Sequence, residues 1–209
     1  MYEIYNEFKH GKIIFYLYFN TMNMITANKF LHGNIKFDMI TERRTIMGKG
    51  LQPDLFVKSI FTLDINWLKE RGIKGVLLDI DNTLITHKQK IPDNKVIELI
   101  KFFQENNIQT AIVSNATRRR VEVFNKKLGL YARYRSFKPS RKGFCKAMGK
   151  LKLIPEETAV IGDQLFTDVR GGNRLGLTTI LVEPLDVNEP VTVRLKRLIE
   201  KMLVKKDPV

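Results

Sequence analysis

The chain has 209 residues, of which 44% are hydrophobic, so it has room for one α/β domain with its own core and an appendage. The single cysteine, Cys145, excludes an internal disulfide framework and fits a reducing compartment. The longest apolar run, residues 13–19, is far too short to span a bilayer, and the net charge of +14 favours anionic substrates or surfaces.

Residues 1–46 differ from the rest of the chain and form the first predicted region, an irregular extension. They mix scattered aromatic residues with Asn and His and show neither a regular period nor helix caps. Residues 42–47 can be encoded with AGGAGG shortly before an ATG codon, which resembles a bacterial ribosome-binding site read through as protein. Two explanations stay open: a start assigned too early, with Met47 as the native first residue, or a genuine N-terminal extension.

The second predicted region, residues 47–209, alternates strands and helices throughout. After an apolar segment at 51–61, apolar periods and cap signals predict helices at residues 64–71, 93–106, 118–127, 141–151 and 169–175. Apolar runs predict strands at residues 75–80, 109–114, 132–135, 158–161 and 178–182. This alternation is typical of right-handed βαβ units, so we expect an α/β fold with a doubly wound parallel sheet covered by helices on both faces.

Two aspartates end the first predicted strand, within the run GVLLDIDNTL at residues 75–84. Asp79 and Asp81 stand two residues apart where a buried strand gives way to a loop, and unpaired charge is costly near a core. In open α/β sheets, ligands bind in the crevice at the carboxyl ends of the strands. Two acids placed there can hold a hard cation and divide the roles of nucleophile and acid–base catalyst.

Other polar groups follow later strands in the same way. In chain order the groups are D-x-D, Ser-Asn, Lys-Pro and G-D-x-x-x-x-D, carried by Asp79, Asp81, Ser114, Asn115, Lys138, Asp163 and Asp168. Each group alone is weak evidence of a functional site. The four groups in this order, each at a strand end, are a much more specific signal. The alternative, that loop aspartates merely cap helices, is strongest for Asp168, which could N-cap the helix predicted at 169–175.

This ordered set resembles the haloacid dehalogenase (HAD) superfamily of phosphohydrolases, whose core is Rossmann-like. The resemblance implies that Asp79 attacks phosphorus and carries an aspartyl-phosphate, while Asp81 acts first as acid and then as base. Thr83 fits the D-x-D-x-T form usual in phosphatases. Mg²⁺ is expected among the Asp79 side chain, the Asp81 backbone carbonyl and Asp163, with Asp168 in support, because oxygen ligands suit a hard ion.

The resemblance also implies a phosphate-binding site, and the spacing of the motifs predicts that no cap domain covers it. Ser114 and the Asn115 backbone are expected to hold phosphoryl oxygens, and Lys138 to offset negative charge as a point charge. The intervals 84–110 and 138–163 are filled by one predicted helix each, which leaves no room for a cap and favours a bulky or tethered substrate. Phosphomutases share these residues, so hydrolysis and phosphotransfer both stay open.

Most of residues 47–209 resembles the small bacterial YqeG-type phosphatases of HAD subclass IIIA. The segments that carry this resemblance are PDLFVKSI at 53–60, RGIKG at 71–75, DNTL at 81–84 and GDQLFTDVRGGNR at 162–174. This branch is similar to mitochondrial and plastid phosphatidylglycerophosphate phosphatases. The resemblance therefore implies a lipid-linked phosphate as the leading substrate. The single cysteine adds the expectation of a cytoplasmic enzyme, and the basic charge described next adds that of peripheral contact with an anionic membrane.

Basic charge is concentrated between residues 116 and 152, where thirteen Lys and Arg residues face Glu122 alone, a local charge of +12. This segment could attract an anionic substrate or surface, or it could be an ordinary solvated surface. Residues 192–206 predict a basic amphipathic helix, which could lie in a membrane interface or pack on the sheet.

Two competing functions remain. The first is a phosphatase of a soluble nucleotide or sugar phosphate. The second is a ribosome- or nucleic-acid-associated binder that uses the same basic charge for phosphate-backbone contacts. The second would not need the acid pair, and the sequence has no evident aromatic RNA-binding motif, so nucleic acid is the weaker prediction.

Overall fold

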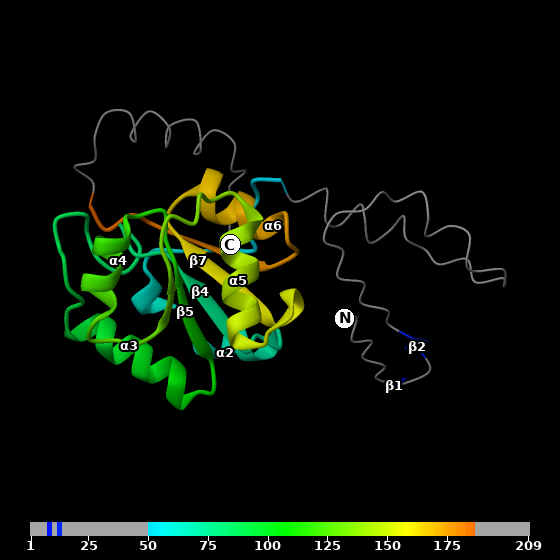
Figure 1. Cartoon of the computed structure of the whole chain (residues 1–209). Coiled ribbons are helices and arrows are strands. Elements are labelled where there is room, and N and C mark those ends of the chain that lie inside the picture. The colour runs from blue at the N-terminus through cyan, green and yellow to red at the C-terminus, as the bar shows by residue number, and fades with distance from the viewer. Residues whose placement is uncertain (1–7, 10–11, 14–49, 187–209) are drawn as a thin grey trace. The chain divides into compact units, whose positions relative to one another are not determined.

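The computed structural model describes residues 8–9, 12–13 and 50–186 (Figure 1). The chain divides into two compact units, Met1–Asp38 and Met39–Val209. In the first unit, strands β1 (Phe8–Lys9) and β2 (Lys12–Ile13) form an antiparallel pair. The rest of the predicted extension at 1–46 and the amphipathic helix predicted at 192–206 lie outside the described residues.

The second unit is built on a six-stranded sheet in the order β3-β8-β7-β4-β5-β6, with every neighbouring pair parallel. Its strands are β3 (Leu55–Val57), β4 (Gly75–Leu78), β5 (Gln109–Val113), β6 (Tyr131–Arg133), β7 (Thr158–Gly162) and β8 (Thr178–Val182). The doubly wound parallel sheet predicted from the alternating pattern is therefore confirmed.

Helices connect these strands. They are η2 (Ile60–Thr62), α2 (Ile65–Glu70), α3 (Asn94–Glu105), α4 (Arg118–Asn125), α5 (Arg141–Leu151), η3 (Pro155–Glu157), the π-helix η4 (Leu165–Val169) and α6 (Arg170–Asn173). Two of the predicted helices begin at capping aspartates: the Asp64 and Asp93 side chains accept hydrogen bonds from backbone N–H groups in the first turns of α2 and α3. Among the described residues, no helix is long and apolar enough to cross a bilayer.

The sheet has a hydrophobic layer on each face because alternate strand residues point to opposite sides. On one face, Leu78 and Ile112 pack with Phe103 of α3 and Phe124 of α4. On the other, residues such as Leu77 pack with Phe144, Ala147 and Met148 of α5. Figure 1 shows α3 and α4 on one side of the sheet and α5 and α6 on the other.

The strand order places the predicted site residues along one edge. β4 lies between β7 and β5 in register, with Leu78 opposite both Ile161 and Ile112. Asp79, Asp163 and Ser114 directly follow β4, β7 and β5, so all three leave the sheet at neighbouring carboxyl ends. The chain crosses from β6 back to β7 on the far side of β4, which makes this edge a topological switch point.

Several elements differ from the prediction: the short 3-10 helices η2 and η3 are not among the predicted helices, and two further differences concern β3 and α6. The apolar segment at 51–61 contains a strand, β3, that pairs with β8 but was not predicted; it is only three residues long and lies at the sheet edge. The helix predicted at 169–175 is instead the π-helix η4 followed by the short α6. A Cβ on Gly171 would meet the Phe144 ring at 2.5 Å, so α6 packs too closely to tolerate a larger residue there.

Candidate active site

Asp79 and Lys138 form the centre of the site. Asp79 is 6% exposed, and its backbone N–H donates to the Ile161 carbonyl of β7 at 3.1 Å, which fixes the start of the loop. The Lys138 ammonium lies 2.8 Å from Asp79 Oδ1 and 2.7 Å from Asp168 Oδ1. Lys138 is itself 5% exposed, so one buried cation joins two carboxylates that are 89 residues apart in the chain.

The ionisation of these groups follows from their burial. Burial raises the pKa of Asp79 to about 6; Lys138 acts in the opposite direction, and Asp168 adds to the rise. For Lys138, burial by itself lowers the pKa, but the two carboxylates outweigh it and hold the pKa above its ordinary value. At neutral pH the pair is therefore an ammonium facing a carboxylate that is still able to act as a nucleophile.

Asp168 is part of this cluster and does not cap a helix. It lies within the π-helix η4, and its carboxylate accepts hydrogen bonds from Lys138, from the Thr167 hydroxyl at 3.0 Å and from the Gln164 N–H at 3.3 Å. The N-cap alternative is therefore wrong, because the wider π turn brings the side chain back toward β7. π-helical turns are frequent at functional sites.

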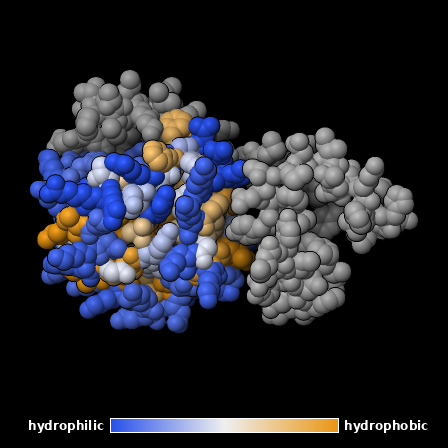
Figure 2. Space-filling model, viewed as in Figure 1, coloured by the Kyte–Doolittle hydropathy of each residue, from blue (hydrophilic) through white to orange (hydrophobic). Residues whose placement is uncertain are grey.

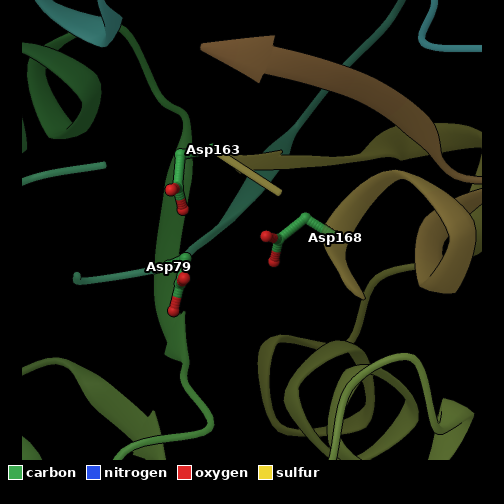
Figure 3. Close-up of side chains that lie close together, drawn as sticks. All are labelled: Asp79, Asp163 and Asp168. Carbon is green, nitrogen blue, oxygen red and sulfur yellow. The ribbon is translucent and has the colours of Figure 1, made fainter. Parts of the chain in front are cut away.

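Three buried carboxylates, those of Asp79, Asp163 and Asp168, lie together (Figure 3). Each offers an oxygen, and these oxygens all lie within 4.8 Å of one another. Lys138 can balance only one negative charge, and ionised carboxylates are costly to bury unless paired or bound to a metal. An all-oxygen donor set with excess negative charge fits a hard divalent cation. Thr83 supports the cluster, since its hydroxyl donates to Asp163 at 3.4 Å.

The sequence predicts Asp168 only as a supporting residue for the metal. The structure places it within the carboxylate cluster, together with Asp79 and Asp163. The Asp81 carboxylate is not in the cluster, because it faces Arg120 and His87 instead. The expected metal contact of Asp81 is through its backbone carbonyl, and this stays a prediction.

Arg120 is the site residue that sequence reasoning missed. Its Nε donates to Asp81 Oδ1 at 3.0 Å, its Nη2 donates to the same oxygen, and its side chain is only 19% exposed. In the sequence it belongs to an Arg-Arg-Arg run, a pattern typical of a solvated surface. The usable signal is its position directly before the buried Val121, on the helix that follows the Ser-Asn group.

Ser114 and Asn115 form the loop beside this centre. Ser114 is 1% exposed, and its hydroxyl oxygen accepts from the Ala116 N–H at 3.1 Å. The Asn115 side chain clamps the Lys138 backbone: its amide donates to the Lys138 carbonyl at 3.2 Å, and its carbonyl accepts from the Lys138 N–H at 2.7 Å. The Asn115 side chain therefore positions Lys138. This role is separate from the phosphate contact expected of the Asn115 backbone.

Gly162 allows Asp168 to enter the cluster, because a Cβ there would lie 2.2 Å from the Asp168 carboxyl carbon. Gly162→Ala should displace that carboxylate, lowering kcat about 10²-fold and the free energy of unfolding by about 1–3 kcal/mol. Gly149→Ala is the matched control, because its Cβ meets nothing within 4 Å and alanine favours the helix. Urea unfolding and steady-state kinetics measure both; unchanged kcat in Gly162→Ala would remove Asp168 from the site.

Comparisons with known proteins identify the family to which the sequence is related. The sequence model of the haloacid dehalogenase-like hydrolase family matches residues 87–176. The protein named "Probable phosphatase YqeG" from Bacillus subtilis is 40% identical over 159 residues, which cover 76% of this chain and 92% of that protein. Phosphatidylglycerophosphate phosphatase 1 of Arabidopsis thaliana is 32% identical over 168 residues, which cover 74% of this chain and 47% of that protein.

Among solved structures, the cobalt-bound deoxy-D-mannose-octulosonate 8-phosphate phosphatase of Haemophilus influenzae aligns with 20% identity and a TM-score of 0.43. That alignment covers 61% of this chain and 77% of the other. Because the Bacillus relative matches over nearly its whole length, the family is established by sequence. The chain therefore belongs to the YqeG-type phosphatases of the haloacid dehalogenase-like hydrolases.

Proposed function

We propose that this phosphatase is a Mg²⁺-dependent phosphomonoesterase that acts through an aspartyl-phosphate on phosphatidylglycerophosphate at a membrane surface. The observation that carries the chemical part is the buried group of Asp79, Asp163 and Asp168 around Lys138 at the carboxyl edge of the sheet. The lipid part rests on the Arabidopsis relative and on the surface beside Lys138.

The reaction has two balanced steps. In the first, an Asp79 oxygen attacks phosphorus, the bond from phosphorus to the leaving oxygen breaks, and Asp81 gives that oxygen its proton. In the second, Asp81 takes a proton from water as the water oxygen attacks phosphorus, which releases phosphate and restores the Asp79 carboxylate. Water as final acceptor is what distinguishes this hydrolase from a phosphomutase.

The other residues bind the phosphoryl group and offset its charge. Lys138 lies beside the nucleophile and so can neutralise an arriving phosphate oxygen. The Ser114 hydroxyl and the Asn115 N–H are the proposed donors to the remaining oxygens. Mg²⁺ held by Asp79, Asp163 and the Asp81 carbonyl, with Asp168 beside it, would supply the charge neutralisation that lets a carboxylate approach an anionic phosphate.

A lipid head group is compatible with the loops around the site. Residues 79–93 and 134–140 follow β4 and β6, and besides the isolated bridge between Asp81 and Ile85 they contain no strand or helix. Within residues 50–186, therefore, no cap domain is inserted after these strands. A site without a cap can act on a phosphate that is still anchored in a bilayer.

The basic segment is mostly exposed, as a membrane-facing role requires. Its exposed members are Arg118, Arg119, Lys126, Lys127, Arg135, Arg141, Lys142, Lys146, Lys150 and Lys152. Figure 2 shows hydrophilic residues dominating the face that carries α5. Arg120 and Lys138 do not contribute to this surface, because both are bound to acids of the site.

Phe137 marks the part of this surface nearest the chemistry. It is 75% exposed, while its neighbours Ser136 and Lys138 are 4% and 5% exposed. Arg135 and Phe137 have φ values of 44° and 52°, a left-handed conformation that costs a non-glycine residue about 1–2 kcal/mol. Hydrogen bonds from the Ser136 N–H to the Ser114 carbonyl at 3.0 Å and from the Ser140 N–H to the Phe137 carbonyl at 2.8 Å hold the loop backbone. The loop thus presents an aromatic ring to solvent one residue before the site lysine.

We define the docking surface as Phe137 with the exposed Arg135, Arg141 and Lys142. An aromatic ring among cations is the combination that binds an anionic bilayer: burial of a Phe contributes about 1.5–3 kcal/mol, and each basic residue near the surface about 1 kcal/mol. The ionic part should weaken as salt shortens the Debye length from about 10 Å at 0.1 M to about 3 Å at 1 M.

Phe137→Asp should lower turnover of phosphatidylglycerophosphate in anionic vesicles about tenfold more than turnover of a soluble phosphate ester. Phe102→Asp is the matched control, since Phe102 is 42% exposed on α3. Equal losses on vesicles and soluble ester, or equal losses in both variants, would refute docking through Phe137.

The substrate itself is tested by comparing kcat/KM for phosphatidylglycerophosphate, nucleotides and sugar phosphates with purified protein and Mg²⁺. We expect the lipid to be preferred, and more so in anionic than in neutral vesicles. A clear preference for a nucleotide or sugar phosphate would refute the lipid part and leave the phosphatase chemistry in place.

A further inference from the structure

Arg120 holds the Asp81 side chain from one direction. The arginine is the third residue of α4, and its guanidinium reaches the loop after β4. Nε and Nη2 both donate to Asp81 Oδ1, while Nη1 donates to the Gln89 carbonyl and Nη2 lies 3.4 Å from the Thr86 carbonyl. Because these carbonyls fix the guanidinium, Arg120 can impose a single orientation on Asp81.

Both hydrogen bonds from Arg120 to Asp81 are made to the same carboxylate oxygen, Oδ1. His87 Nδ1 also lies near Oδ1, at 3.5 Å. Oδ2 of Asp81 takes part in no hydrogen bond or ion pair within residues 50–186. An oxygen that accepts two guanidinium N–H groups is a poor place for a proton, so in the acid form of Asp81 the proton belongs on Oδ2.

We infer that Arg120 is a positioning residue for phosphoryl transfer: it fixes Asp81 through Oδ1 and leaves Oδ2 as the oxygen that gives and takes the proton. This role depends on the acid–base function proposed for Asp81. Arg120 itself touches no reacting atom in this scheme. Its effect should therefore appear only where proton delivery to the leaving group limits the rate.

Leaving-group dependence separates this role from a structural one. An aryl phosphate with a good leaving group needs little protonation, whereas an alkyl phosphate depends on a general acid, which contributes roughly 10²–10⁴-fold. Arg120→Gln should lower kcat for the alkyl ester about 10²-fold and kcat for the aryl ester less than about fivefold. Arg120→Lys should recover part of the alkyl rate, because lysine keeps the charge and loses the two-donor geometry.

Arg119→Gln provides the matched control. Arg119 is the preceding residue of the same helix, is exposed and makes no hydrogen bond or ion pair within the described core. We expect both ester rates to stay near wild type in this variant. The aryl rate of Arg120→Gln reports on folding, so a general collapse of the loop is visible as a loss on both substrates.

A double-mutant cycle with Asp81→Asn tests whether Arg120 acts through Asp81. If Arg120 acts through Asp81, adding Arg120→Gln to Asp81→Asn should lower the alkyl rate by less than about twofold. Additive losses, or equal losses of Arg120→Gln on both esters, would overturn the positioning role. If Asp81→Asn itself shows no leaving-group dependence, the proposed acid–base function fails; if only Arg120→Gln lacks it, the inference about Arg120 fails.

Discussion

Replacing Asp79 by asparagine is expected to lower phosphatase activity by roughly 10⁴–10⁶-fold, the range expected when a covalent nucleophile is removed. The amide keeps the size of the carboxylate, so the loop after β4 should keep its backbone bond to Ile161. Steady-state hydrolysis of an aryl phosphate with Mg²⁺ measures the loss, and circular dichroism checks that the fold is retained.

Asp93→Asn is the matched control for this substitution. Asp93 caps α3 through a hydrogen bond from the Val96 N–H, and asparagine caps a helix about as well as aspartate. Its activity and stability should therefore stay near those of the wild type. A rate for Asp79→Asn within tenfold of the wild type would show that this carboxylate is not the nucleophile.

Replacing Lys138 by methionine should destabilise the fold as well as the site. The substitution keeps the apolar stem and leaves Asp79 and Asp168 buried without their shared cation, and breaking a buried pair in this way costs about 3–5 kcal/mol. The loss of a preorganised charge should also lower kcat about 10²–10³-fold. Urea unfolding measures the loss in the free energy of unfolding. A chelator is present so that bound metal ions do not contribute to stability.

The stability loss in Lys138→Met should depend on pH in a defined direction. Burial already raises the pKa of Asp79 to about 6, and removing the ammonium removes the interaction that opposes this rise. A carboxyl whose pKa is higher folded than unfolded costs stability above its folded pKa and not below its unfolded value. The loss should therefore be larger at about pH 8 than at about pH 5.

Lys146→Met is the control for the Lys138 variant, because Lys146 is exposed on α5. It should change the free energy of unfolding by less than about 0.5 kcal/mol. A similarly small change in Lys138→Met would mean that the ammonium does not hold the two carboxylates together.

The positions of the site residues could be predicted because strand ends determine them. Apolar runs that stop at Asp79, Ser114 and Asp163 identify neighbouring parallel strands, and the carboxyl ends of such strands meet at one edge of the sheet. The strand–helix alternation and the caps at Asp64 and Asp93 follow from equally local rules.

Other features depend on contacts that no local pattern records. Arg120 and Arg119 are adjacent and chemically identical, yet only Arg120 points at Asp81; helix phase against a distant loop decides this. From the sequence, Asp168 could either cap a helix or join the carboxylate cluster. The π turn places it in the cluster, and this placement requires that position 162 carry no side chain. Strand β3 forms at the sheet edge, where three residues with alternating exposure give little signal.

The central claim is that Asp79 carries the phosphoryl group during turnover. Rapid acid quenching with a ³²P-labelled phosphate ester, followed by borohydride reduction and peptide mapping, tests it most directly. We predict labelled protein during the first turnover and homoserine at position 79 after reduction, with neither in Asp79→Asn. Product formation without labelled protein, or label on another residue, would contradict the account.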